Sequence, residues 1–419
     1  MSVPEAIGGY FELELRKGHH PYPQAIAFNS ARSAFKALVL ARNLRRVHLP
    51  IYICDVMQDV LRGSGIEVMR YALTERLELP DHPALQADEA LLFVNYFGLK
   101  ADYISEVLAV RYGKQLIVDN SQALFSLPQS GIATLYSPRK FVGVADGGWL
   151  ANAPAGLPQA RSSRSQARFG ALLGRLEDSP QHHYATFQAL EQALENDGVK
   201  AMATSTARLL DSIDYHEVAR RRIDNLAHLR RRLDHLNRFA IWPVQPVAAL
   251  CYPLLVKSAE TATRLRAQLL DQHIYVPSYW REVLNNPTVP PIERDWAQCL
   301  LPLPIDQRYN VDDMNRLADV ILQNTGKIMS IQGQRILLRA LELEDLPLLH
   351  QWSNDEALWS LLGGWHFPTS REAQREWLLG LKSDSLNQRF GIEVQGHGLI
   401  GTANLVSIDW KKTVQPNTA

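Results

Sequence analysis

The sequence predicts an α/β fold in which a mostly parallel β-sheet is covered by helices on both faces. Between residue 25 and about residue 153, short apolar runs alternate with helical patterns, and this alternation is typical of such a sheet. Two of the apolar runs end in polar residues, Asn95 and Asp119. Ligands bind beyond the carboxyl ends of parallel strands, so these positions are candidates for a functional site.

The elements of this sheet can be placed from the spacing of the apolar residues. The expected strands are Ala25–Phe28, Val47–Pro50, Ile66–Tyr71, Leu91–Asn95 and Leu116–Asp119. The expected helices are Ala31–Leu44, Cys54–Leu61 and Tyr103–Tyr112. In the first helix, apolar residues recur at helical spacing and indicate an amphipathic element with one apolar face.

The middle of the chain changes in character. Residues 155–240 are rich in Arg, Gln, Leu and His and predict helices, the clearest of which is Val218–Leu236. Residues 241–325 predict a compact α+β subdomain. Its expected elements are a strand Val247–Leu255, a helix Thr261–Gln272, a strand Ile274–Val276, the segment Leu300–Ile305 and a helix Asn310–Gln323. Pro253 removes a backbone donor from the first strand, which favours a sheet edge.

A linker at residues 326–334 precedes a new pattern. The elements expected there are a strand Arg335–Arg339, helices Asp345–Ser353 and Arg371–Leu381, and strands Arg389–Val394 and Leu399–Ile408. The expected division is therefore a large domain with an N-terminal arm and a helical segment (1–240), a small subdomain (241–325), the linker, and a C-terminal segment (335–419).

Composition limits the classes of function. The 419 residues allow two or three domains, and 44 Lys and Arg residues balance 44 Asp and Glu residues. The formal net charge of zero gives no field that would favour nucleic acid or an anionic membrane surface. We interpret the basic stretches Arg161–Arg175 and Arg220–Arg222 as solvated helix faces or loops.

Cysteine usage and hydropathy indicate the compartment. Cys54, Cys251 and Cys299 form no CxxC pair, and their odd number does not suit a disulfide framework, which fits a reducing cytosol. No apolar run approaches the ~20 residues that span a bilayer. The histidine pairs lack the spacing of metal ligands. We expect a cytoplasmic protein with neither a metal ion nor a membrane segment.

Asp119 and Lys140 carry the strongest chemical signal. Asp119 ends an apolar run, and Lys140 lies in a later loop marked by serine and glycine. This arrangement suits pyridoxal phosphate (PLP), because the carboxylate can hold the pyridine nitrogen protonated and the lysine amine can form a Schiff base. Alone, Asp119 could instead cap a helix and Lys140 could be an ordinary surface lysine.

Several ordered motifs extend over the first 325 or so residues. They are Asn29-Ser30-Ala31-Arg32-Ser33-Ala34, Pro50-Ile51-Tyr52-Ile53-Cys54, Asn95-Tyr96-Phe97-Gly98, Val118-Asp119-Asn120-Ser121-Gln122-Ala123, Ser137-Pro138-Arg139-Lys140 with Gly147-Gly148, and Leu301-Pro302-Leu303-Pro304-Ile305. In order and spacing they resemble the DegT/DnrJ/EryC1/StrS sugar aminotransferases. This resemblance implies the type I fold of PLP-dependent transferases, with a large, mostly parallel sheet domain and a small α+β domain.

The resemblance also implies a role for each matching residue. Asp119 would face the pyridine nitrogen, and Lys140 would hold the cofactor and shuttle the proton during transamination. The cofactor phosphate would lie on the turn at the helix N-terminus, where backbone N–H groups bind anions. The cofactor contacts implied in addition to Asp119 and Lys140 are Ser30, Ala31 and Arg32 in that turn, Ser137 as a second phosphate contact, and Gln122 at the phenolic oxygen.

Two departures from the family pattern affect the same site. Ala31-Arg32 stands where Gly-Thr is usual, and Arg32 could either add charge to the phosphate site or crowd it. Cys54 stands where an aromatic ring usually stacks on the cofactor. Either Tyr52 supplies that contact from a shifted register, or the cofactor is bound more weakly. Tyr52 could equally be a tyrosine of the core.

The expected function is therefore that of a PLP-dependent aminotransferase acting on a nucleotide-linked keto-deoxysugar in surface polysaccharide or amino-sugar biosynthesis. Glutamate is the expected amino donor, and the family assembles as homodimers. Two alternatives stay open. A sugar dehydratase of the same fold would carry histidine at the position of Lys140. A degenerate site serving as a scaffold or regulator would account for the changes at Arg32 and Cys54.

The C-terminal segment resembles the first half of a GNAT acetyltransferase. Arg335–Ala340 with Leu343–Leu349 matches its opening strand and helix, and Gly391–Val394 with Leu399–Leu405 matches its next hairpin. The glycine-containing loop that holds the pyrophosphate of coenzyme A (CoA) in that family is absent from this sequence. We therefore expect a partial GNAT-like segment that neither binds CoA nor transfers an acetyl group.

Overall fold

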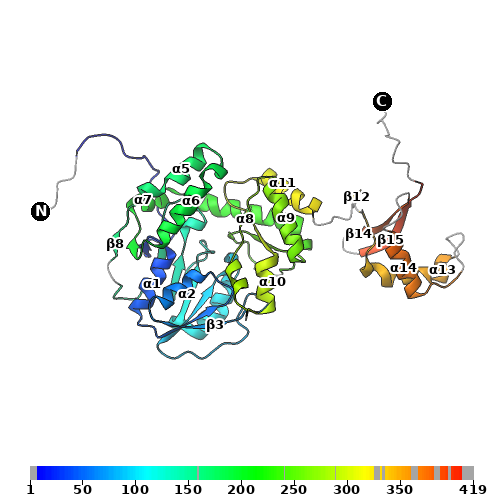
Figure 1. The fold of residues 1–419 in the computed structure, drawn as a ribbon, viewed down its shortest axis with the longest axis horizontal. Coiled ribbons are helices and arrows are strands. Elements are labelled where there is room, and N and C mark those ends of the chain that lie inside the picture. The colour runs from blue at the N-terminus through cyan, green and yellow to red at the C-terminus, as the bar shows by residue number, and fades with distance from the viewer. Residues whose placement is uncertain are drawn as a thin grey trace. The chain divides into compact units, whose positions relative to one another are not determined.

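The computed structural model describes residues 7–157, 160–239, 241–287, 289–324, 331–332, 336–359, 367–381, 387–394 and 398–407. Internal contacts divide the chain into two units, Met1–Asn324 and Thr325–Ala419 (Figure 1). No helix in these described ranges combines the length and hydropathy needed to cross a membrane.

A nine-stranded sheet forms the centre of the first unit, in the order β3-β2-β4-β5-β6-β7-β1-β9-β8. The strands are β1 (Ile26–Phe28), β2 (Arg46–Pro50), β3 (Glu67–Tyr71), β4 (Glu89–Val94), β5 (Leu116–Asn120), β6 (Ala133–Tyr136), β7 (Gly148–Ala151), β8 (Arg161–Ser162) and β9 (Lys200–Ala201). The five strands from β3 to β6 pair in parallel, whereas β7 is antiparallel to both of its neighbours. The mostly parallel sheet predicted from the sequence is confirmed.

The helices of this region are α1 (Ala31–Ala41), α2 (Asp55–Arg62), the helical segment Ala101–Tyr112 that comprises α3, a π-helical turn and α4, α5 (Gly170–Glu177), α6 (Pro180–Glu195), α7 (Thr204–Ser212) and α8 (Tyr215–Leu233). Helix α1 buries its predicted apolar stripe, including Phe35 and Leu38, which are fully buried. Each such side chain contributes about 1.5–3 kcal/mol through removal from water. This burial fixes the N-terminus of α1 against the sheet.

A two-stranded antiparallel sheet, β10 (Tyr252–Leu255) with β11 (Leu300–Leu303), lies among α9 (Ala259–Asp271), α10 (Pro291–Cys299) and α11 (Val311–Asn324). Pro253 pairs with Pro302 in this ladder. Both strands are edges, which is where a residue without an N–H is tolerated. Helix α8 packs against α11 and β10, so the expected boundary at residue 240 separates α8 from elements that it contacts.

Two sequence predictions in this region are wrong. Residues 247–251 do not extend β10, because the Leu250 N–H donates instead to the carbonyl of Phe97 at 2.9 Å. The expected strand Ile274–Val276 is irregular. There, the Ile274 N–H closes the end of α9 by donating to the Leu269 carbonyl at 2.8 Å.

The second unit contains an antiparallel sheet in the order β12-β13-β14-β15, formed by Ile331–Gln332, Ile336–Arg339, Gln388–Val394 and Gly398–Leu405. Its helices are α12 (Leu346–Ser353), α13 (Glu356–Trp359) and α14 (Arg371–Gly380). The Arg339 guanidinium joins β13 to the loop before α12 through Asp345 at 2.7 Å, and to β14 through Glu393 at 2.5 Å. The predicted end residues Arg335 and Ile408 lie outside the described residues.

Candidate active site

Asp119 lies at the carboxyl end of β5, between β4 and β6 in the parallel part of the sheet. Its side chain is buried, and its Oδ1 accepts a hydrogen bond of 2.8 Å from the Ser121 N–H. The neighbouring strand β4 leads to Asn95, whose amide donates to Asn120 and whose Oδ1 accepts from the Lys100 N–H. Asn95 therefore shapes the strand ends, while Asp119 supplies the buried carboxylate.

Lys140 ends a short 3₁₀ turn, Pro138–Lys140, in the loop between β6 and β7. Its side chain is exposed. The next carbonyl, that of Phe141, accepts hydrogen bonds from the Arg222 guanidinium at 3.3 Å and from the Gln307 amide at 2.8 Å. Two side chains from distant segments therefore fix the backbone beside Lys140.

Arg222 corrects one interpretation of the sequence. The cluster Arg220–Arg222 was expected to be a solvated helix face, but Arg222 is only 1% exposed. Its guanidinium also donates to the carbonyls of Ala249 and Leu250, and it lies 4.6 Å from the centre of the Phe141 ring. A buried arginine is tolerated here because several backbone carbonyls accept its hydrogen bonds.

Cys54 links the lysine loop to Asp119. It precedes α2 and is half-buried. Burial raises the pKa of the Cys54 thiol above its ordinary value, the Lys140 ammonium opposes this rise, and the Asp119 carboxylate adds to it. Asp119 and Lys140 follow the neighbouring parallel strands β5 and β6, so the two charges come from the same edge of the sheet.

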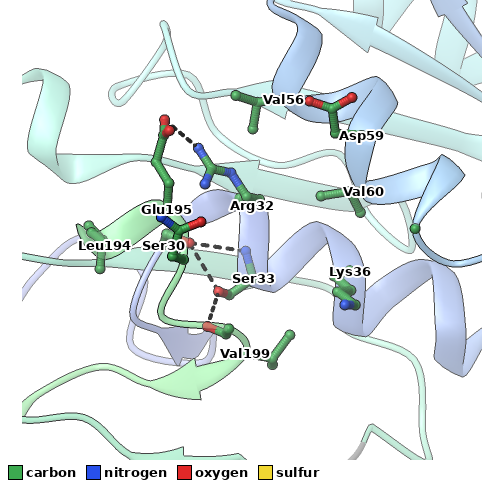
Figure 2. A pocket seen from close by; sticks show the side chains of 13 residues that line it. Ser30, Arg32, Ser33, Lys36, Val56, Asp59, Val60, Leu194, Glu195 and Val199 are labelled. Carbon is green, nitrogen blue, oxygen red and sulfur yellow. Dashed lines mark hydrogen bonds and ion pairs between the residues drawn. The ribbon is translucent and has the colours of Figure 1, made fainter. Parts of the chain in front are cut away.

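Ser30 forms the turn that the sequence predicts for a phosphate. It caps α1 by accepting a hydrogen bond of 3.1 Å from the Ser33 N–H, and its hydroxyl donates to the Ser33 hydroxyl (Figure 2). A bridge joins Ser30 to Gly147. A Cβ on Gly148 would lie 2.2–2.5 Å from backbone atoms of Ser30 and Ala31, so only glycine lets β7 approach the turn so closely.

Two arginines adjoin this turn and are paired with one helix. Arg32 contacts Glu195 at 2.9 Å, and Arg139 contacts Glu191; both glutamates belong to α6 (Figure 2 shows the first pair). Burial, opposed by Asp146 and aided by the Arg32 guanidinium, lowers the pKa of Arg139 to about 10. The two arginines are therefore electrostatic neighbours.

We use the term cradle for Ser30, Arg32, Ser137 and Arg139. Within the described part of the chain, the Nε atoms of Arg32 and Arg139 are buried and have no hydrogen-bond partner. A buried donor without an acceptor costs about 1–3 kcal/mol. Each arginine of the cradle thus has an unsatisfied N–H group, and Arg32 lies in the first turn of α1, which fits an anion such as phosphate.

The predicted cofactor contacts Gln122 and Tyr52 both engage other parts of the protein. Gln122 is buried, and its Oε1 accepts from the Phe97 N–H at 2.9 Å, holding Phe97 at a φ of 57°. Tyr52 is fully buried and its ring packs against Trp280 and Trp296. The structure therefore favours the core interpretation of Tyr52 over stacking on a cofactor, since its ring faces are covered by protein.

A cavity of about 320 Å³ lies beside α1 and α2, with Leu194 and Glu195 of α6 on its rim. It shares Ser30 and Arg32 with the cradle, and Val56 and Val60 contribute apolar wall (Figure 2). Neither Asp119 nor Lys140 lines it. We therefore locate the chemistry at the strand ends and treat this cavity as adjacent to it.

Solved structures share this architecture over the first unit. DesV from S. venezuelae is 17% identical with a TM-score of 0.53, covering 73% of this chain and 86% of that protein. DesI, solved in the presence of its TDP-sugar product, is 21% identical with a TM-score of 0.52, covering 73% and 81%. A DegT DnrJ EryC1 StrS aminotransferase from Brucella abortus is 17% identical with a TM-score of 0.51, covering 72% and 86%. The chain has the fold of these sugar aminotransferases.

The C-terminal unit gives a separate match. Residues 335–416 match the family model of the acetyltransferase (GNAT) domain. A comparison with curated protein sequences finds no match. The type I fold and the GNAT-like segment expected from the sequence are both confirmed.

Sequence reasoning did not identify Arg139, Glu191, Glu195, Arg222 and Gln307 as parts of the site. Arg139 was visible, because it precedes Lys140 in the quoted motif. The others lie on elements remote in sequence, and Glu195 pairs with a residue 163 positions away. No local pattern carries such a pairing.

Proposed function

We propose that the chain is a PLP-dependent aminotransferase that acts on a nucleotide-linked keto-deoxysugar. The observation that carries this proposal is the placement of Asp119, a buried carboxylate near the carboxyl end of β5, and of Lys140 in the turn that follows the neighbouring parallel strand β6. The cradle arginines add unsatisfied donors. An amine, a buried carboxylate and an anion site are the three features that a phosphorylated pyridine aldehyde requires. The shared fold with sugar aminotransferases supports the same conclusion.

Each residue then has a role. Lys140 would attach the cofactor covalently and move a proton during transamination, and Asp119 would hold a proton on the pyridine nitrogen. Ser30, Arg32 and Ser137 would hold the phosphate, and Gln122 would face the phenolic oxygen. When bound, the cofactor supplies an electron sink for the amino group's α-carbon.

The finer assignments follow from the relatives. DesI was solved in the presence of its TDP-sugar product, which supports a nucleotide sugar as the substrate class. We propose glutamate as the amino donor, a homodimer as the assembly, and amino-sugar or surface polysaccharide synthesis as the pathway class. For the C-terminal unit we propose no acetyl transfer, and a titration with CoA should show no saturable binding; saturation would contradict this.

The proposal is tested by an absorbance titration of the full chain with PLP. A visible band should form with the wild type and be absent from Lys140→Ala, while the exposed Lys114→Ala control behaves as the wild type. Glutamate should bleach the band, and a keto-sugar nucleotide should restore it. A chain that develops no band with added PLP would refute the proposal.

Two observations favour a second candidate, a scaffold without catalysis. The arginines of the cradle are already paired with carboxylates, and Tyr52 is covered by other aromatic residues. A scaffold would fold normally and stay colourless in the titration. A sugar dehydratase is less consistent with the sequence, since Lys140 stands where histidine would be needed.

A further inference from the structure

Helix α6 supplies both carboxylates that face the cradle. Glu191 and Glu195 are four residues apart, so they lie on the same side of the helix. Glu191 pairs with Arg139 and Glu195 with Arg32 at 2.9 Å. One helix therefore neutralises the two arginines that adjoin the candidate phosphate turn.

The same helix is weakly anchored by apolar contacts. Of the 16 residues of α6, all of them described, only Leu194 is buried, and Tyr184 and Phe187 are exposed. Helix α5 packs against it, with the His183 ring occupying the space above Gly174. With little apolar burial, this α5–α6 hairpin belongs to the elements that open locally at low cost. Its ion pairs therefore have a large share in holding it at the cradle.

The arginine contacts are incomplete in a way that points to another acceptor. Each guanidinium uses Nη2 toward α6, while its Nε is buried without a partner among the described residues. In this structure each of the two carboxylates accepts from Nη2 and leaves the Nε of the same guanidinium without a partner. A phosphate, with more acceptor oxygens and a larger charge, can accept from Nε and Nη2 together.

We propose that Glu191 and Glu195 compete with a phosphate group for Arg139 and Arg32, so that helix α6 and a phosphorylated ligand exclude each other at the cradle. In the ligand-free chain the carboxylates neutralise the arginines. When phosphate binds, the carboxylates leave, and the C-terminal turn of α6 detaches. The identity of the natural ligand rests on the proposed function, whereas the exchange concerns any phosphate group.

The test compares the full-length wild type with Glu191→Gln, Glu195→Gln and the double variant, using calorimetric titration with PLP, pyridoxal and inorganic phosphate. Pyridoxal lacks the phosphate and is the matched ligand control. Glu177→Gln removes an exposed carboxylate of the same hairpin and is the matched protein control. The double variant should bind PLP and inorganic phosphate roughly three- to tenfold more tightly, because a competing ion pair is lost. Its affinity for pyridoxal should not change.

Hydrogen exchange on the wild type provides a readout that needs no variant. Inorganic phosphate should accelerate amide exchange in residues 180–195. The proposed competition would be refuted if the variants bound phosphate equally or more weakly, or if phosphate slowed amide hydrogen exchange in α6. Either result would show that the carboxylates orient the arginines instead. If phosphate binds and loosens α6 but PLP gives no Lys140-dependent band, the proposed function fails and this inference stands.

Discussion

Glu293 provides the sharpest test of how burial controls this structure. It lies on α10, its residue is 0% exposed, and one carboxylate oxygen accepts a 2.8 Å hydrogen bond from the Leu73 N–H. The other oxygen, Oε2, is buried without a partner among the described residues. Burial raises the pKa of Glu293 from 4.5 to about 7, although the Leu73 hydrogen bond and Arg70 oppose the rise.

The sign of the pH effect follows from this raised pKa. The folded state binds the proton more tightly than the unfolded state, so folding is favoured when Glu293 is protonated. The stabilisation from the protonated Glu293 is fully present below about pH 4.5 and is lost as the pH rises to about 7. Above that pH, no further stability is lost through this group. At 1.36 kcal/mol per pKa unit, the loss is at most roughly 3 kcal/mol.

The perturbation is Glu293→Gln, which keeps an acceptor for Leu73 and removes the charge. Urea denaturation at about pH 5 and about pH 8 gives the free energy of unfolding of each protein. The variant should be more stable than the wild type at the higher pH, by up to roughly 3 kcal/mol, and nearly equal at the lower pH. Glu75→Gln, at an exposed position, is the matched control. An equal difference at both pH values would refute the reasoning.

Two further predictions concern the site's framework. Gly148→Ala should reduce phosphate and PLP affinity at least tenfold and lower the free energy of unfolding by about 1–3 kcal/mol, because its Cβ would collide with Ser30 and Ala31. Titration and denaturation measure the two effects. The control is Gly143→Ala in the preceding loop, where nothing lies within 4 Å of the added Cβ. Arg222→Met should lower the free energy of unfolding by about 2–4 kcal/mol and weaken the PLP band, because the carbonyls of Ala249, Leu250 and Phe141 each lose one donor and that of Phe141 keeps only Gln307. The exposed Arg231→Met should leave both unchanged, and equal effects of the two variants would contradict the role of Arg222.

Five of the nine strands of the large sheet could be predicted because their signal is local, whereas β6, β7, β8 and β9 were not predicted. The apolar run that leads to Asp119 forms β5 within one residue of its predicted end. The strand at Ile274 could not be excluded from the sequence, because its N–H is used by a tertiary arrangement at the end of α9. A β-branched segment predicts a strand only when its backbone groups are free to pair.

The candidate site likewise contains residues that the local sequence predicts and residues that only long-range contacts define. Asp119 and Lys140 were predicted from the chemistry that each residue type can perform next to a strand end. Glu191 and Arg222 act through long-range contacts, 52 and 81 positions from their partners, and nothing in the neighbouring residues encodes those distances. Arg222 was also misjudged because the exposed Arg220 and the half-buried Arg221 precede it on the same helix.

The position of β1 has a consequence for how the protein is made. The first strand of the chain pairs with β7 on one side and β9 on the other. On the ribosome, Ile26–Phe28 must wait until residues 148–151 have been synthesised before it gains its first partner. Until then its edges have no sheet partner, and unpaired strand edges can associate with other chains.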